Sequence, residues 1–354
     1  MLFAAAHPNS ANSQLRNYRR PAAPSPSGNL TPQQRHPKRA EEMGNMSRTL
    51  VFALLLTFVS TCYAQFNFTS VNVPGAVATV ARGINNSSEV VGFYQTVACS
   101  NYDRNVPNCA TEGFKLVNGV YTKFMVAKST STAFMGVNDL GDRVGFYMKS
   151  DGTRHGFILY HQGTFKNLDY PGLSSPYFTV PMGINKAGTV VGGVWSISAT
   201  GTFSSSGWQW VNGTFTSLNP GGTGNGTCCQ SVNGISNNGI TVGQVFLADF
   251  WQAWLVEGTD QDFWEYQSGD SYAEAVDQNA DVAGYSTFGG GWFAQKIEAN
   301  EGNGDSEGTI SFKVVDYPNS QSTTPFGMNN SRNLAGTYVD SSGQQHGFTA
   351  TPTF

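Results

Sequence analysis

The sequence predicts an all-β protein, a six-bladed β-propeller with four short antiparallel strands in each blade. Three observations predict this fold. A ten-residue unit recurs six times, its spacing suits one blade per copy, and the strand missing from the last copy is found near the start of the chain. The 41 glycines and the 12% of charged residues agree, because both are typical of turn-rich all-β chains.

The recurring unit has an apolar residue, a short polar residue, a turn and an apolar run that ends in glycine. Copy 1 reads Gly83-Ile84-Asn85-Asn86-Ser87-Ser88-Glu89-Val90-Val91-Gly92. The copies, numbered one to six, begin at Gly83, Gly136, Gly183, Gly234, Ala275 and Gly327. The short polar side chain can accept hydrogen bonds from backbone N–H groups two residues on, which closes a tight turn. We therefore expect a β-hairpin in every copy.

Two further strands are expected after each hairpin. The third keeps an aromatic residue, which suits a large buried anchor, and it reads His155-Gly156-Phe157 in copy 2 and His346-Gly347-Phe348 in copy 6. The slot of these histidines is filled in the other copies by Glu112, Ser206, Gln252 and Gly290. A slot that accepts such different residues indicates a structural hydrogen bond for both histidines, rather than catalysis.

The two ends of the chain indicate ring closure. The last copy stops after its third strand, at Phe354, and a segment like the fourth strand appears at Phe68–Gly75. We expect this N-terminal strand to pair with the C-terminal blade and to close the ring, whereas an open solenoid would need polar end caps.

The units Gly-Ile-Asn-x-x-Gly-x-Val-Val-Gly and His-Gly-Phe resemble the bacterial HAF extracellular repeat family, which is named for a His-Ala-Phe triplet. The triplet here is His-Gly-Phe, at 155–157 and 346–348. The resemblance covers nearly all of the chain after residue 64. It implies an exported, propeller-like protein, and it implies no activity and no catalytic residue.

The amino-terminal segment does not belong to the repeats. Residues 1–45 are rich in Pro, Ser, Gln and Arg and would be disordered, or they reflect a gene-start error with Met46 as the true start. Residues 46–64 read as a signal peptide cleaved after Ala64, with an apolar run too short for a membrane span. A lipoprotein through Cys62 is less favoured, because Thr61 is larger than the residue expected there. Residues 65–354 would then form a secreted or periplasmic bacterial propeller.

The charge of residues 65–354 argues against some partners. They hold 13 Lys and Arg and 22 Asp and Glu, so 13 − 22 = −9. An acidic surface disfavours nucleic acid and anionic membranes. A glycan or protein ligand stays open, no cofactor is indicated, and we expect a monomer.

Four cysteines remain after the predicted cleavage. Export exposes them to oxidising conditions, so we expect a disulfide between Cys99 and Cys109, which flank one polar loop. For the adjacent Cys228 and Cys229 a vicinal disulfide, two thiols and cross-pairing are all open.

Two groups of residues are candidate sites. Asp277, Asn279 and Asp281 match the start of a calcium loop, but Val282 stands where such a loop needs glycine, and the segment aligns with the hairpin turn of the other copies. A solvated acidic rim is the favoured interpretation of this stretch, and a calcium site is the less favoured alternative. All seven tryptophans lie between residues 195 and 292, and Trp195, Trp251 and Trp264 fall outside the anchor positions. Exposed aromatic residues can stack on sugars or peptides, so these three are candidates for ligand binding.

The sequence favours a secreted, non-catalytic binding or scaffold module. It contains no GxSxG, HExxH or P-loop signature after residue 64. The alternative is a propeller hydrolase, of the glycosidase or lactonase kind, with a carboxylate site at the mouth of the central channel. An arginine and a carboxylate, or two carboxylates, within hydrogen-bond reach at that mouth would favour the hydrolase.

Overall fold

The computed structural model describes residues 65–98, 109–172, 177–197, 203–220, 229–247, 250–266, 269–287, 290–297 and 309–354. All described residues belong to one compact unit, which spans Ala64–Phe354. These residues form strands and turns and no helix, which confirms the prediction of an all-β protein.

Three copies of the repeat each form a separate four-stranded antiparallel sheet. Copy 1 forms β2 (Ala78–Ile84), β3 (Val90–Gln95), β4 (Glu112–Val117) and β5 (Val120–Phe124). Copy 4 forms β14 (Gln230–Ile235), β15 (Thr241–Leu247), β16 (Phe250–Glu257) and β17 (Asp260–Trp264). Copy 5 forms β18 (Ser271–Val276), β19 (Val282–Ser286), β20 (Gly290–Ile297) and β21 (Thr309–Val315).

Copies 2 and 3 share one eight-stranded sheet, so the structure has five sheets where the sequence predicts six. Copy 2 forms β6 (Ser131–Val137), β7 (Arg143–Met148), β8 (Arg154–Leu159) and β9 (Phe165–Asn167). Copy 3 forms β10 (Tyr177–Ile184), β11 (Val190–Ile197), β12 (Phe203–Val211) and β13 (Thr214–Ser217). The link is a parallel pairing of β8 with β10 at Arg154 and Phe178, where the guanidinium lies 4.8 Å from the phenyl ring centre. Within each copy the four strands are antiparallel, as predicted.

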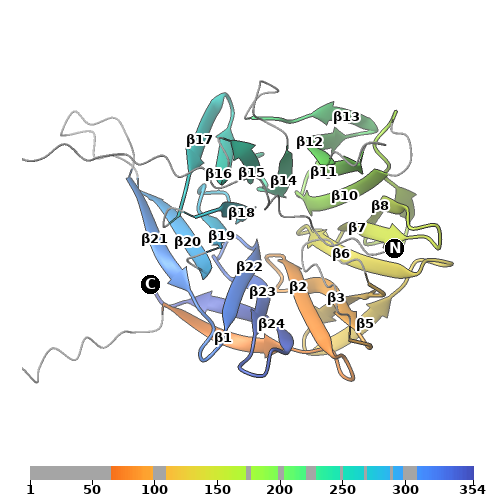
Figure 1. The fold of residues 1–354 in the computed structure, drawn as a ribbon, viewed down its shortest axis with the longest axis horizontal. Coiled ribbons are helices and arrows are strands. Elements are labelled where there is room, and N and C mark those ends of the chain that lie inside the picture. Colours follow the sequence, from red (N-terminus) through yellow and green to blue (C-terminus); the bar gives the residue numbers. More distant parts are fainter. Residues whose placement is uncertain are drawn as a thin grey trace, which may run out of the picture. The chain divides into compact units, whose positions relative to one another are not determined.

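The N-terminal strand completes the sheet of copy 6. β1 (Phe66–Val71) pairs antiparallel with β24 (Gln345–Pro352), followed by β23 (Leu334–Val339) and β22 (Ser322–Met328). Figure 1 shows this strand, in orange, beside the blue strands of the C-terminal end. The predicted pairing is therefore present, although the strand begins two residues before the predicted Phe68 and ends at Val71.

The first strand of each copy lies innermost, and Figure 1 shows the sheets placed around a common centre. β2 lies against β6 and β22, and the chain of contacts runs on through β10, β14 and β18. The repeat glycines allow this approach: a Cβ on Gly136 would lie 2.8 Å from the carbonyl oxygen of Met182, and one on Gly327 would lie 2.8 Å from the Cα of Gly83. At Gly136, Gly234 and Gly327, which begin three of the units, a neighbouring backbone occupies the space that a side chain would need.

The short polar residue of the unit has two roles. Asn85 Oδ1 accepts hydrogen bonds from the backbone N–H groups of Ser87 and Glu89, at 3.0 and 2.9 Å, which confirms the predicted turn. Its Nδ2 also donates to the carbonyl of Asn138 in the next copy, at 3.0 Å. The same donation links Asn329 of copy 6 to the carbonyl of Asn85, at 3.1 Å. The sequence did not reveal this second role, because the acceptor lies about fifty residues away or at the other end of the chain.

The third strands supply the aromatic anchors of the core, as predicted. The anchors Phe114, Phe157, Trp208, Trp254, Trp292 and Phe348 are all fully buried. Most of these rings lie against the glycine that ends the recurring unit. A Cβ on Gly336, for example, would lie 2.3 Å from a carbonyl oxygen and 2.6 Å from the ring of Phe348.

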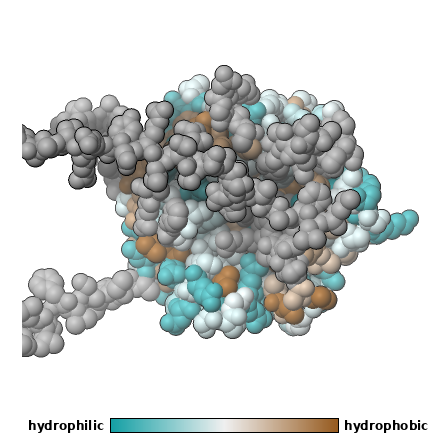
Figure 2. All heavy atoms as spheres, in the orientation of Figure 1, coloured by the Kyte–Doolittle hydropathy of each residue, from teal (hydrophilic) through white to brown (hydrophobic). Residues whose placement is uncertain are grey.

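Figure 2 shows hydrophilic and hydrophobic residues interspersed over the part of the described surface that is visible. No helix long and apolar enough to cross a membrane occurs among the described residues.

Candidate functional site

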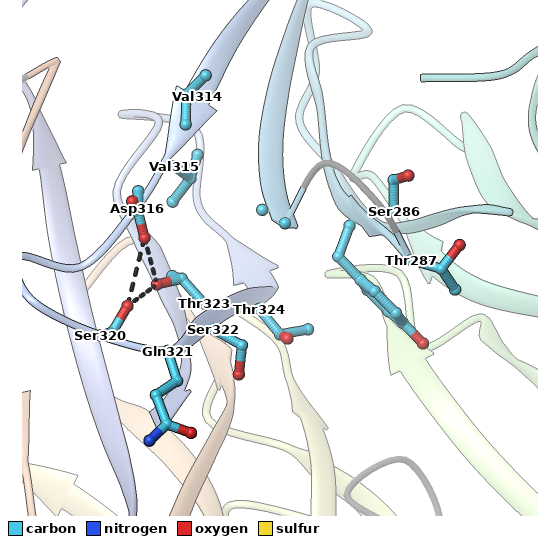
Figure 3. A pocket seen from close by; sticks show the side chains of 13 residues that line it. Ser286, Thr287, Val314, Val315, Asp316, Ser320, Gln321, Ser322, Thr323 and Thr324 are labelled. Carbon is cyan, nitrogen blue, oxygen red and sulfur yellow. Dashed lines mark hydrogen bonds between the residues drawn. The ribbon is translucent and has the colours of Figure 1, made fainter. Parts of the chain in front are cut away.

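A cavity of about 440 Å³ lies between copies 5 and 6. We call it the cleft. One wall comes from the end of β19 and the start of β20, and the other from the end of β21, the following turn and the start of β22. Figure 3 shows Ser286 and Thr287 on the first wall and Asp316 with Ser320 and Thr323 on the second. The cleft therefore lies where the inner strand of copy 6 begins, at the end of the molecule opposite the recurring hairpin turns.

Comparison of the copies explains why this space is open. In copy 2, Tyr147 of the second strand pairs with His155 of the third, and their rings stack with centres 5.3 Å apart. In copy 6, Tyr338 and His346 form the same pair, with centres 5.0 Å apart. In copy 1 the pair is Tyr94 and Glu112, joined by a hydrogen bond. Three copies thus fill this position with two large side chains.

Copy 5 has small residues at the same paired position. Ser286 stands where those copies have tyrosine, and Gly290 stands opposite it in the strand register. Gly290 has a φ of +68°, and nothing lies within 4 Å of the place that a Cβ would take there, so the described part of the third strand starts with no side chain over the cleft. The cleft lies beside this pair of small residues.

The acceptor that serves the histidine in other copies is retained. His155 Nδ1 lies 3.0 Å from Asp169 Oδ2, and His346 Nδ1 lies 3.0 Å from Asn72 Oδ1. The residue at this place in copy 5 is Asp316, which is exposed at the cleft. Its Oδ1 accepts hydrogen bonds from the hydroxyls of Ser320 and Thr323, both at 3.3 Å, and no described residue bonds its Oδ2.

The cleft is rich in hydroxyl groups and has one carboxylate. Besides Asp316 its described lining includes the hydroxyls of Thr287 and Ser322, which bond no other described side chain, and the apolar surface of Val314, which is 49% exposed. The described lining residues include no histidine, cysteine, lysine or arginine. This arrangement can hold a polar ligand by hydrogen bonds, but it offers no pair of groups for acid–base or nucleophilic chemistry.

The central channel holds a different set of side chains. Every inner strand has a β-bulge, and the bulged residue faces the channel: Arg82, Met135, Met182, Asn233, Glu274 and Phe326. A β-bulge turns the extra residue out of the regular alternation of the strand. Because these six side chains are not part of the packing that all copies share, they can differ from copy to copy.

An arginine and a carboxylate do meet in the channel. Arg82 Nη2 lies 3.5 Å from Glu274 Oε2, and both side chains are 3% exposed. The guanidinium also lies 3.9 Å from the ring centre of Phe326. This pair is close enough for an ion pair, but it lies inside the channel and not at an open mouth, where the hydrolase prediction places its site.

The turn end of the channel is covered by polar side chains. Asn237 Nδ2 of copy 4 donates to Asp139 Oδ2 of copy 2, at 2.8 Å. Asp139 also accepts from the backbone N–H of Asn86, at 2.9 Å, and Asn86 accepts from the backbone of Asn330. These bonds join copies 1, 2, 4 and 6 across this end.

The three candidate tryptophans fall in two places. Trp195 packs against the buried cluster around the channel, as does Tyr272, and the Trp251 ring lies 6.0 Å from Tyr272. Burial, with the carboxylates of Asp270 and Glu274 as further causes, raises the pKa of the Tyr272 hydroxyl well above its usual value. Trp264 lies apart, with its ring 6.1 Å from the anchor Trp292. All three are half-buried, and a role in ligand binding stays a prediction.

The predicted calcium-loop residues serve the turn of copy 5. Asp277 Oδ1 accepts from the backbone N–H groups of Asn279 and Asp281, at 2.8 and 3.0 Å, as the repeat requires. Asp281 Oδ2 lies 2.7 Å from Arg332 Nε in copy 6. Among the described residues no group of three His, Cys, Asp or Glu side chains could hold a metal ion.

The cysteine predictions fall mainly on residues outside the described ranges. Cys99 and Cys228 are not among the described residues, so the Cys99–Cys109 disulfide stays a prediction. Cys229 is buried next to the inner strand of copy 4. The predicted signal peptide also lies outside the described ranges.

Comparison with known proteins adds the fold alone. No protein-family model and no curated protein matches the chain. Among solved structures it is similar to a mutant of the Aleuria aurantia lectin in complex with Fucα1-6GlcNAc, at 9% identity and a TM-score of 0.45, covering 80% of this chain and 98% of that chain. It is also similar to a gluconolactonase from Xanthomonas campestris, at 10% identity and a TM-score of 0.44, covering 82% and 96%. A neuraminidase-like protein of A/little yellow-shouldered bat/Guatemala follows, at 13% identity and a TM-score of 0.43, covering 81% and 98%.

The class of the protein follows from its own sheets. Repeated four-stranded antiparallel units stand around a common centre with their first strands innermost, which is the architecture of a β-propeller. The similar structures are too distant for their ligands or activities to carry over to this chain.

Proposed function

We propose that the protein is a six-bladed β-propeller, closed by β1, that is exported from a bacterial cell and works as a non-catalytic binding or scaffold module for a glycan or protein ligand. The six-bladed ring is supported by the contacts of β2 with both β6 and β22, and by the pairing of β1 with β24. Export is supported by the signal-like sequence at residues 46–64.

The cleft is the observation that carries the binding function. It is concave, its volume lies within the range of small-molecule sites, and its described lining supplies hydroxyls and one carboxylate without a catalytic pair. It also lies where one copy departs from the others, so the repeat alone does not account for its residues.

The alternative function, a propeller hydrolase, rests on Arg82 and Glu274. Their side chains are 3% exposed, and Met135, Met182 and Phe326 surround them, so a substrate would need the channel to open. This requirement makes hydrolysis the second candidate.

Two assays on the same purified protein distinguish the functions. We expect saturable binding on a glycan array or to cell-wall material, and no turnover of chromogenic glycosides or lactones. Turnover that is lost in the Glu274→Gln variant would establish the hydrolase. Absence of both binding and turnover would overturn the proposed function.

A further inference from the structure

We propose that the cleft between copies 5 and 6 binds a single non-acidic sugar residue, which takes the place that an internal tyrosine–histidine pair fills in copies 2 and 6. This inference rests on the proposed binding function and names the ligand class and the residues that select it.

The first step is the position of the acceptor. In copies 2 and 6 a side-chain oxygen of Asp169 or Asn72 accepts from an imidazole nitrogen at 3.0 Å. Asp316 keeps this place in copy 5 but faces Gly290, which has no side chain. A ligand with a hydrogen-bond donor can therefore take the place of the imidazole N–H that is present in copies 2 and 6. Its hydrogen bond to the Asp316 carboxylate would be stronger than one to a neutral acceptor.

The second step concerns the kind of ring. A planar ring in copies 2 and 6 stacks on tyrosine, at 5.3 and 5.0 Å between centres. Ser286 replaces that tyrosine, so the ring of this pair is absent. The small Ser286 side chain, whose hydroxyl donates to the carbonyl oxygen of Tyr266 at 3.2 Å, lines the space instead. A sugar suits this change because it needs many hydrogen-bond partners and no stacking face.

The third step matches the remaining lining to a sugar. The hydroxyls of Thr287 and Ser322 stand on opposite walls, and each can both donate and accept. Val314, 49% exposed at the rim, offers a small apolar contact for the C–H groups of a sugar ring. A cavity of about 440 Å³ has room for one sugar residue.

The fourth step is charge selection. The described lining has two ionisable side chains, those of Asp316 and Tyr285, and it includes no lysine or arginine. A sugar carboxylate would meet a like charge without compensation, so uronic and sialic acids are disfavoured. Neutral sugars and amino sugars keep the favourable bond to Asp316.

The experiment measures binding of methyl glycosides by ligand-observed NMR. The panel contains methyl glycosides of glucose, galactose, mannose, fucose, N-acetylglucosamine and glucosamine, with glucuronic and sialic acid as acidic members. We expect at least one non-acidic member to bind with a Kd on the order of 1 mM, as a ligand of that size allows. We expect no binding of the acidic members.

Two variants locate the site. Ser286→Tyr restores the tyrosine of the other copies and should abolish binding, because the ring would occupy the cleft. Asp316→Asn keeps the shape and one acceptor oxygen, and it should weaken binding about tenfold or more, since it removes the charge from the bond. The matched controls are Ser87→Tyr, in an exposed hairpin turn at the other end of the molecule, and Asp260→Asn, on an exposed strand of copy 4.

The outcomes separate this inference from the proposed function. Sugar binding that both cleft variants lose and both controls keep supports the cleft. Sugar binding that survives Ser286→Tyr and Asp316→Asn overturns the cleft as its site but leaves a binding function intact. Preference for acidic sugars, or binding of imidazole or a histidine-containing peptide in place of any sugar, overturns the ligand class. If Ser286→Tyr fails to fold, Asp316→Asn decides alone.

Discussion

Removing one partner of the buried ion pair in the channel should destabilise the protein more than removing any exposed charge. Arg82 and Glu274 lie 3.5 Å apart at 3% exposure. At an effective dielectric constant of about 20, their attraction is about 5 kcal/mol. Replacing Arg82 with methionine removes this attraction and leaves the carboxylate of Glu274 inside the channel. Breaking one partner of a buried pair costs about 3–5 kcal/mol, so we expect a loss of that size in the free energy of unfolding.

Equilibrium denaturation in urea, followed by tryptophan fluorescence, measures this loss. The double variant Arg82→Met with Glu274→Leu removes both charges and should recover most of the stability, because an apolar replacement of a buried pair is often close to neutral. Lys186→Met is the control for loss of a cation at an exposed site, with an expected change within about 0.5 kcal/mol.

Two results would refute this reasoning. One is a stability of Arg82→Met within about 1 kcal/mol of the unmodified protein. The other is a double variant no more stable than the single one, which would show that Glu274 does not need its arginine.

Three further predictions concern the fold. Phe66→Ala, at a ring of β1 that is 2% exposed, should cost about 3–5 kcal/mol in urea denaturation, and a loss below about 1 kcal/mol would show that β1 does not hold the last sheet. Gly336→Ala places a Cβ 2.3 Å from a backbone carbonyl oxygen. It should lower the melting temperature by more than Gly343→Ala, which lies in an open turn with a φ of +84°. Equal decreases in melting temperature would contradict the close packing at Gly336. For Asp142, burial alone raises the pKa, but bonds from His161 and a neighbouring amide outweigh it and lower the pKa below 3.8. The stability that this carboxylate contributes is therefore present above pH 3.8 and is lost as the pH falls further. Asp142→Asn should be less stable than the unmodified protein at pH 7, and it should lose less stability between pH 4 and pH 2, in acid titrations followed by circular dichroism. An acid titration curve that is the same for both proteins would contradict this.

The sequence predicted the local structure well, because each copy of the repeat has the same kinds of residue at its turn and at its aromatic anchor. Asn85 closes its turn with the bonds that an asparagine there should make. The aromatic anchors, such as Trp208 and Phe348, recur at one position of the third strand in every copy, and a large ring kept at one position suits burial. The pairing of β1 with β24 was predictable from a missing strand at one end and a surplus strand at the other.

Contacts between copies were not predictable from the repeat. The Nδ2 donation of Asn85 to the following copy depends on how close two turns approach. The shared sheet of copies 2 and 3 depends on a single pairing, that of Arg154 with Phe178. The channel residues lie on β-bulges, and alternation along a strand assigns a face to each residue only where no bulge intervenes. Arg82 and Glu274 therefore meet without a signal in either local sequence.

The cleft did have a signal, and it lay in pairs of positions and not in single residues. Gly290 alone gives no signal, because its position on the third strand holds a different residue in most copies, and that variety indicates a structural role. The register shows that this slot is read together with a position on the preceding strand: His155 with Tyr147, His346 with Tyr338, and Gly290 with Ser286. In a repeat protein a small residue does not by itself indicate a cavity, because a large residue opposite it on the neighbouring strand can fill the space. In copy 5 both members of the pair are small and the acceptor beside them, Asp316, is kept, so this copy has lost volume but not polarity, and the proposed ligand site rests on that combination.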